Sequence, residues 1–158
     1  SSKIVLTRVQ GKAVGGGVGI MAASDYVIAS KYASVRLSEL AVGIGPFVIG
    51  PAVERKIGLS AFAKMALTPD EWQTAEWALQ RDLVQEVFEE VKQVDEYIDF
   101  LIAKWNSYSP DAMNKLKKAL WQGTENWDEL LAERAAISGR LVLSEFTKDA
   151  INSFKSKS

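Results

Sequence analysis

Residues 11–29 read GKAVGGGVGIMAASDYVIA, and this stretch decides how the first half of the chain folds. Residues 13–19 (AVGGGVG) are too rich in glycine for the interior of a stable helix. We therefore expect a tight turn there, at which the backbone comes close to another group. We expect residues 20–23 to begin a buried helix, and residues 26–29 (YVIA) to form a strand.

Outward from this stretch, hydrophobic patterning predicts strands and helices up to about residue 90. Strands are expected at residues 4–9, 34–40 and 83–88, and a helix at residues 52–67. Residues 43–51 (GIGPFVIGP) form a second loop rich in Gly and Pro. Thr68 followed by Pro69 and Glu71 predicts a helix that begins at Thr68 and runs to about Gln80.

From residue 91 onward the pattern is helical throughout. Apolar side chains recur at helical spacing over residues 91–105, and Ser109-Pro110 begins the next helix. Two more helices are expected, at residues 129–143 and 144–154. We therefore divide the chain into an α/β core, residues 1–90, and a helical segment, residues 91–158.

The composition excludes several kinds of chemistry. The 158 residues contain no His and no Cys, which excludes Ser–His and Cys–His catalytic pairs, His-ligated metals and disulfides. The net charge of −1 gives no basic footprint for nucleic acid. No apolar stretch approaches the ~20 residues that span a membrane. We expect a cytoplasmic protein whose chemistry uses carboxylates, Lys, Tyr, hydroxyls or backbone N–H groups.

The glycine triplet Gly15-Gly16-Gly17 leaves consecutive N–H groups bare of side chains. Such a loop at the start of a helix suits a phosphate or a developing oxyanion. Two other interpretations stay open: a tight turn packed against a neighbouring strand, and a dinucleotide site. The second rests on Gly17-x-Gly19-x-x-Ala22 with Glu39 ~20 residues further on, but no alternating βαβα series follows.

Glu39 is the candidate acid/base. Strand alternation through residues 35–39 (VRLSE) places Val35, Leu37 and Glu39 on one, buried face. Burial raises the pKa of a carboxyl group, which suits proton transfer near neutral pH. The alternative is a glutamate at a strand end that bends out to solvent.

Taken together, these motifs resemble the enoyl-CoA hydratase/isomerase (crotonase) superfamily, and the resemblance covers essentially the whole chain. It rests on Gly11-x-Ala13-Val14-Gly15-Gly16-Gly17, Ala22-x-x-Asp25-Tyr26-x-x-Ala29, Ser38-Glu39-x-x-x-Gly43, Pro46, Arg55-x-x-Gly58 and Ala150-x-x-x-Phe154-x-x-Lys157. It displaces the dinucleotide interpretation. It implies a spiral of ββα units followed by a C-terminal helical segment that holds trimers together, often paired into hexamers.

The resemblance also implies a site. The N–H of Gly16 would be one of two donors to a thioester oxygen, and Glu39 would be the family's second catalytic carboxylate. Gly15, Gly17, Gly19, Pro46 and Phe47 would line the substrate pocket. Phe154 and Lys157 would help to hold the adenine and phosphate of coenzyme A, which belongs to the substrate; no separate cofactor and no metal are expected.

Three departures from the family pattern bear on the reaction. Gly19 stands where the family's hydratases carry their first catalytic glutamate. Phe47 stands where the loop after Pro46 usually has a glycine, which alters the pocket near Glu39. The family's N-terminal portion, which supplies the other oxyanion donor, has no counterpart in these residues, so we expect it to be present as a second chain or an additional segment.

The resemblance therefore implies an acyl-CoA-handling enzyme, a lyase or an isomerase of fatty-acid metabolism or amino-acid degradation. A single carboxylate suffices to move a double bond, so isomerisation is favoured over hydration. A branched substrate such as a methylglutaconyl thioester would also fit. The alternative is a non-catalytic member that binds coenzyme A thioesters or only assembles oligomers.

Overall fold

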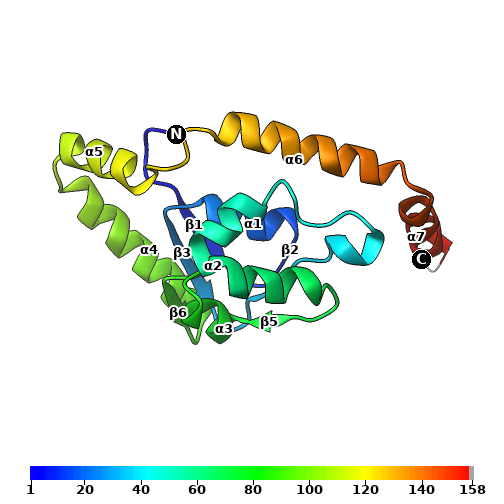
Figure 1. The fold of residues 1–158 in the computed structure, drawn as a ribbon. Helices are drawn as coiled ribbons and strands as arrows, with labels where there is room; N and C mark the ends of the chain where they lie inside the picture. The colour runs from blue at the N-terminus through cyan, green and yellow to red at the C-terminus, as the bar shows by residue number, and fades with distance from the viewer. Residues whose placement is uncertain (157–158) are drawn as a thin grey trace.

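The computed structural model describes residues 1–156 as an α/β core with a helical segment wrapped around it (Figure 1). The core contains β1 (Leu6–Val9), β2 (Lys12–Val14), α1 (Gly16–Ala23), β3 (Tyr26–Ser30), β4 (Ser34–Arg36), the 3-10 helix η1 (Glu39–Val42), α2 (Gly50–Leu67), β5 (Gln73–Thr74), α3 (Ala75–Gln80) and β6 (Glu86–Phe88). The helical segment contains α4 (Val91–Asn106), α5 (Pro110–Leu120), α6 (Trp127–Val142) and α7 (Glu145–Ser156).

The first four strands alternate between two sheets, as a spiral of ββα units requires. One sheet has the order β1-β3-β6, with all strands parallel. The other has the order β2-β4-β5, with β4 parallel to β2 and antiparallel to β5. The connections from β1 to β3 and from β2 to β4 both pass through α1, and the connection from β3 to β6 passes through α2 and α3. This arrangement confirms the predicted α/β class and the ββα units.

The core lies between the two sheets and helices α1, α2 and α3. Its fully buried side chains include Val18, Met21, Val27, Leu37 and Val53. Because both faces of these parallel strands are covered, the strand at residues 26–30 reads as a continuous apolar run. The predicted strand at residues 26–29 is thereby confirmed.

The strands predicted at residues 4–9 and 83–88 are shorter, at Leu6–Val9 and Glu86–Phe88. Three further predicted elements differ in where they begin or end. The helix predicted to begin at residue 20 begins at Gly16, because packing of α1 against α2 offsets the low helix propensity of glycine. The strand predicted at residues 34–40 ends at Arg36, and Glu39 begins η1. Thr68 does not begin a helix: its hydroxyl donates to the carbonyl of Lys64 (2.6 Å) at the end of α2, and Thr74 caps α3 instead.

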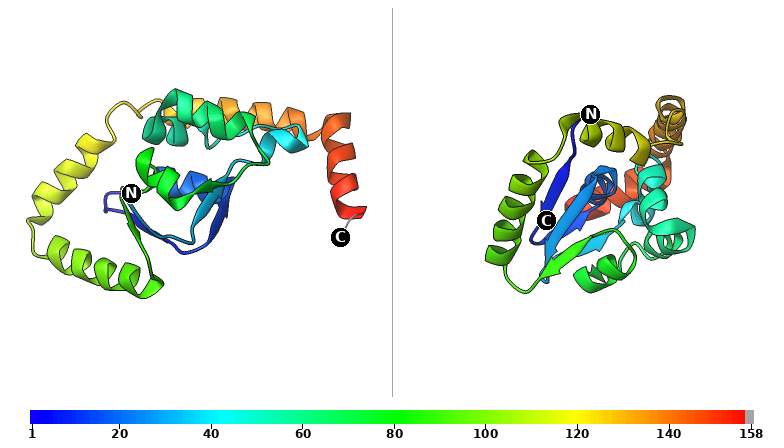
Figure 2. Two further views of the ribbon diagram at one scale, coloured as in Figure 1. Left: turned by 90° about the horizontal axis from the view of Figure 1, so that it is seen from below. Right: turned by 90° about the vertical axis from the view of Figure 1, so that its left-hand side faces the viewer.

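Helices α4 to α7 pass from one side of the core over the top of it to the other (Figure 1). The views in Figure 2 show α6 running beside α2, and α7 standing apart from the sheets at the far end. The guanidinium of Arg134 on α6 lies close to Gly50 at the start of α2.

The boundary between an α/β core, residues 1–90, and a helical segment, residues 91–158, stays a prediction. Among residues 1–156 no helix has the length and apolar character needed to cross a membrane.

Candidate functional site

The N-terminus of α1 presents bare backbone N–H groups. Gly15, the N-cap, has φ +53°, and its N–H donates to the carbonyl of Arg36 (3.0 Å). Its carbonyl accepts the N–H of Gly19 (3.1 Å), the first bond of the helical ladder. The N–H groups of the first turn have no partner inside a helix, and no side chain caps this one. The turn therefore keeps donors available for a ligand oxygen.

The three glycines of the triplet have different surroundings. Gly15 is buried, and Gly16 is exposed. A Cβ built on Gly16 meets no atom of residues 1–156 within 4 Å, apart from its chain neighbours and its own helix backbone. A Cβ on Gly17 makes an ordinary contact with Ala13 at 3.5 Å. Only Gly15 thus requires glycine for the fold, and Gly16 is open toward solvent.

The carboxyl group of Glu39 lies against this turn. A Cβ built on Gly15 would stand 2.7 Å from the Oε1 of Glu39, so a side chain at position 15 would displace the carboxyl group from this place. The Oε2 of Glu39 is buried and has no hydrogen-bond partner among residues 1–156. Burial raises the pKa of Glu39, and a hydrogen bond from its own backbone N–H opposes the shift. Glu39 is half-buried as predicted, but the strand alternation used to predict it does not reach residue 39.

Local backbone bonds hold η1 in place. Gly43 ends it in the left-handed conformation (φ +80°), and its N–H donates to the carbonyl of Leu40 (3.0 Å). The N–H of Ile44 donates to the carbonyl of Glu39 (3.1 Å). Helix α7 packs on this turn: a Cβ on Gly43 would meet Phe146 at 2.5 Å and the Oγ1 of Thr147 at 2.8 Å. The C-terminal helix therefore braces the element that carries Glu39.

The loop between η1 and α2 contains the predicted pocket residues Pro46 and Phe47, both half-buried. The ring of Phe47 packs on the backbone of Gly45, where a Cβ would meet its Cε2 at 2.8 Å. Gly45 itself has φ +99°, which favours glycine. Phe47 is thus held within its own loop.

Gly19 lies one turn further along α1 and is buried against α2. A Cβ built on Gly19 would stand 2.5 Å from the Cγ2 of Ile49 and 3.0 Å from its Cβ. Ile49, the N-cap residue of α2, was not singled out from the sequence. No sequence signal marks it, because the contact joins residues 30 positions apart on two helices.

Of the two residues predicted to hold coenzyme A, the structure describes only Phe154. Phe154 on α7 is 76% exposed, and Lys157 lies outside the described residues. Among the predicted site residues, the structure places Glu39 against Gly15, and Gly16, Gly17 and Gly19 follow Gly15 in the first turns of α1. Within the described part of the chain, no group of three or more side chains of His, Cys, Asp or Glu could hold a metal ion.

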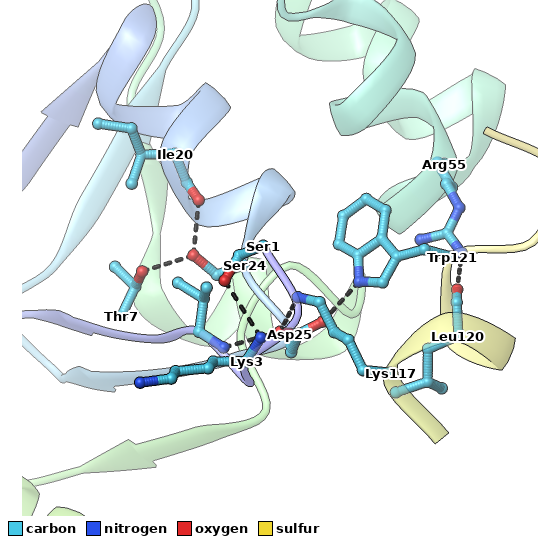
Figure 3. A network of polar contacts seen from close by, with 11 residues as sticks. Ser1, Lys3, Thr7, Ile20, Ser24, Asp25, Arg55, Lys117, Leu120 and Trp121 are labelled. Atoms are coloured by element: carbon cyan, nitrogen blue, oxygen red, sulfur yellow. Dashed lines mark hydrogen bonds and ion pairs between the residues drawn. The ribbon is translucent and has the colours of Figure 1, made fainter. Parts of the chain in front are cut away.

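A separate polar cluster lies at the other end of α1 (Figure 3). Asp25 forms an ion pair with Lys117 of α5, accepts a hydrogen bond from the Nε1 of Trp121 (2.5 Å) and accepts one from the N–H of Val5 (2.7 Å). Burial favours the neutral form of Asp25, but these bonds outweigh it and lower the pKa of the carboxyl group. The cluster ties α5 to the strand layer, and we assign it a structural role.

A cavity of about 810 Å³ lies beside this cluster. Residues near the N-terminus, such as Val5, and residues at the end of α5, such as Lys117 and Trp121, line it. Neither Glu39 nor Gly16 lines it. We locate the candidate site at Glu39 nevertheless. Its buried carboxyl oxygen has no partner among the described residues and can transfer a proton, whereas Lys117 in the cavity is held in an ion pair with Asp25.

Comparisons with known proteins point to one family. Residues 1–157 match the family described as enoyl-CoA hydratase/isomerase. The chain is 32% identical over 158 residues to a 2,3-dehydroadipyl-CoA hydratase of Escherichia coli (strain K12), a match that covers 99% of this chain and 61% of that protein. The chain therefore spans about three fifths of the length of that relative.

Solved structures agree on the fold. An enoyl-CoA hydratase/isomerase from Pseudoalteromonas atlantica T6c superposes with a TM-score of 0.91 at 22% identity, covering 99% of this chain and 63% of that one. A structure described as a putative enoyl-CoA hydratase, from Mycobacterium avium paratuberculosis K-10, superposes with a TM-score of 0.87 at 26% identity, covering 99% and 61%.

Proposed function

This chain belongs to the enoyl-CoA hydratase/isomerase family, and from that premise we propose that it works on enoyl-CoA thioesters with Glu39 as its acid/base. The observation that carries the proposal is the buried Oε2 of Glu39, which has no partner among residues 1–156, beside the open first turn of α1. Burial raises the pKa of Glu39, which is the direction that favours a carboxyl group acting as both acid and base.

The proposed first step is proton abstraction beside the thioester. The N–H of Gly16 donates to the thioester oxygen while Glu39 removes a proton from C-2, and the electron pair of that C–H bond moves into the enolate. Donors aimed at the developing negative charge, with the positive end of the α1 dipole behind them, stabilise the enolate. Gly16 suits this role because it is exposed and carries no side chain that would hold the ligand away.

We propose isomerisation as the reaction. Starting from a 3-enoyl-CoA, the enolate is conjugated with the double bond, and Glu39 returns the same proton to C-4. The product is the 2-enoyl-CoA, and no water, metal or cofactor enters the balance. One carboxylate is enough for both transfers, and position 19, next to Ile49, carries no side chain that could act as a second one.

Hydration is the second candidate, favoured by the name of the Escherichia coli relative, which is a hydratase. In that reaction water adds across the 2,3 double bond, with its oxygen on C-3 and a proton on C-2. A further group, supplied from outside these residues, would have to activate the water. The acyl chain stays open under either reaction, so a substrate panel should include linear esters and a branched methylglutaconyl thioester.

The complete site, we propose, uses more than one copy of the chain. Phe154 is exposed at the end of α7 and is proposed to contact the coenzyme A of a neighbouring subunit, together with Lys157. Large apolar side chains are also exposed elsewhere on the helical segment, among them Phe100, Leu143 and Phe146. Covering such side chains favours association, and we propose a homotrimer or a hexamer, with Pro46 and Phe47 lining the acyl site.

The experiment is a turnover assay of the protein as its host makes it, with 3-enoyl-CoA and 2-enoyl-CoA esters as separate substrates. The account expects formation of the conjugated 2-enoyl ester, and a loss of ~10²–10⁴-fold in rate for Glu39→Gln. Glu54→Gln on α2, an exposed carboxylate, is the matched control and should keep full activity. Coenzyme A binding with no turnover of any ester would contradict the proposal and favour a non-catalytic member.

A further inference from the structure

The side chain of Ile49 fills the space beside Gly19. A Cβ at position 19 would stand 2.5 Å from the Cγ2 of Ile49, a distance at which one of the two groups must move. Gly19 is buried within α1, and Ile49 packs against the hydrophobic core. Positions 19 and 49 thus share one volume, and the isoleucine occupies it.

A rotation of Ile49 would relieve the contact with its Cγ2 but would not clear the space completely. Its Cβ, whose place is set by the backbone, already lies 3.0 Å from the Cβ position at residue 19. That backbone is fixed because the carbonyl of Ile49 accepts the N–H of Val53 (3.1 Å), the first bond of α2. A side chain at position 19 therefore strains this contact in any rotamer of Ile49, and only a residue without a Cβ at position 49 clears the volume.

The excluded side chain would have pointed toward Glu39. In an α-helix the Cα–Cβ bond tilts toward the N-terminus, so a long side chain at position 19 runs back along α1. The N-terminus of α1 is the place where the carboxyl group of Glu39 lies against Gly15. A carboxylate at position 19 would thus approach the carboxyl group of Glu39.

We propose that Ile49 determines the reaction by excluding a second catalytic side chain, and the water it would position, from beside Glu39. This inference rests on the proposed function, because it assigns the choice between isomerisation and hydration to one residue. With Ile49 in place, Glu39 meets an apolar neighbour on this side and transfers protons only between carbons of the substrate. With a smaller residue there, position 19 becomes available for a carboxylate.

The experiment compares Gly19→Glu, the double variant Gly19→Glu/Ile49→Gly and the matched control Gly19→Glu/Val48→Gly. Val48 is the exposed neighbour of Ile49 in the same loop, so the control loosens the loop without clearing the volume. Two readouts are taken: the Tm, and the amounts of 3-hydroxyacyl-CoA and isomerised ester formed from enoyl-CoA.

We expect Gly19→Glu to lower the Tm by about 5–10 °C and to gain no hydration, because overpacking strains the contact between α1 and α2. The double variant should recover most of that Tm and gain hydration by about 10²-fold, the lower end of what a positioned acid or base contributes. The Val48 control should do neither.

Gly19→Glu alone folding with the parent Tm and hydrating the substrate would overturn the inference, as would a Val48 control equal to the double variant. Retained isomerisation with no gain of hydration in a folded double variant would also overturn it, while leaving the proposed function standing. Absence of isomerisation in the parent protein would refute the proposed function instead. In that case, recovery of the Tm in Gly19→Glu/Ile49→Gly would still test whether positions 19 and 49 share one volume.

Discussion

Substitutions at the adjacent glycines Gly15 and Gly16 should separate the needs of the fold from those of the chemistry. Gly15 has φ +53° and ψ −111°, a conformation that L-residues rarely adopt, and its Cβ would stand 2.7 Å from the carboxyl group of Glu39. Gly16 has an ordinary helical backbone and open space around its Cβ position. The same kind of change should therefore act through stability at one position and through catalysis at the other.

For Gly15→Ala we expect the free energy of unfolding to fall by about 1–3 kcal/mol, the usual range for a residue held in a sparsely populated backbone conformation. Activity should fall as well, because the methyl group pushes the carboxyl group of Glu39 aside. For Gly16→Val the free energy of unfolding should change by less than about 1 kcal/mol, because valine is no worse in a helix than glycine. Its kcat/KM should nevertheless fall by ~10²–10³-fold, as expected when one oxyanion donor is blocked.

Denaturant unfolding and kcat/KM with a 3-enoyl-CoA ester are the two measurements, with Gly11→Ala as the control. Gly11 precedes β2, and its Cβ position has no described neighbour within 4 Å, so its substitution should change neither quantity. Unchanged kcat/KM in Gly16→Val would refute the role of that N–H group. Equal losses of stability in the Gly15 and Gly16 variants would show that the whole turn is needed only for folding.

Three further outcomes are expected. Glu39→Gln should stabilise the fold at neutral pH. Because burial raises the pKa of Glu39, the protonated carboxyl group is compatible with the fold in acid, and that contribution to stability is lost as the pH rises and the group ionises. Glutamine does not ionise and avoids this loss. The gain should vanish in acid, and a gain that is the same at pH 4 and pH 8 would contradict it. Asp25→Ala should lower the free energy of unfolding by about 3–5 kcal/mol, because it leaves Lys117 buried without its partner. Removal of the exposed Lys92–Glu96 pair, the control, should lower it by less than about 1 kcal/mol. Similar losses from the two changes would refute the difference expected between a buried and an exposed ion pair. Sedimentation should give the mass of three or six copies, and a monomer at micromolar concentration would contradict the proposed assembly.

The sequence predicted the α/β class and the half-buried Glu39 correctly, but the structural reason for the second prediction was wrong. Alternation along a strand assumed that β4 continued to residue 39, whereas it ends at Arg36 and a 3-10 helix follows. Glu39 is buried because Gly15 leaves room for its carboxyl group, and this contact joins two distant parts of the chain. Periodicity reports local structure and contains no information about such contacts.

The helix starts show the same limit. Thr68-Pro69-Asp70-Glu71 has the residues of a helix start, but Gln73 joins the β2-β4-β5 sheet and delays the helix to Ala75. The triplet at residues 15–17 was predicted to be a turn because glycine destabilises isolated helices. Packing of α1 against α2 overrides that preference, and Ile49, on the second of these helices, could not be identified before the two were placed together.

The most direct test of the central claim is exchange of the C-2 protons of a saturated acyl-CoA ester in D₂O, followed by NMR. A saturated ester can be neither hydrated nor isomerised, so exchange reports only whether Glu39 removes and returns a proton beside the thioester. The account predicts enzyme-dependent exchange that Glu54→Gln leaves intact and Glu39→Gln slows by ~10²-fold or more. Exchange at the parent rate in Glu39→Gln, or none in a parent protein that binds the ester, would contradict the account.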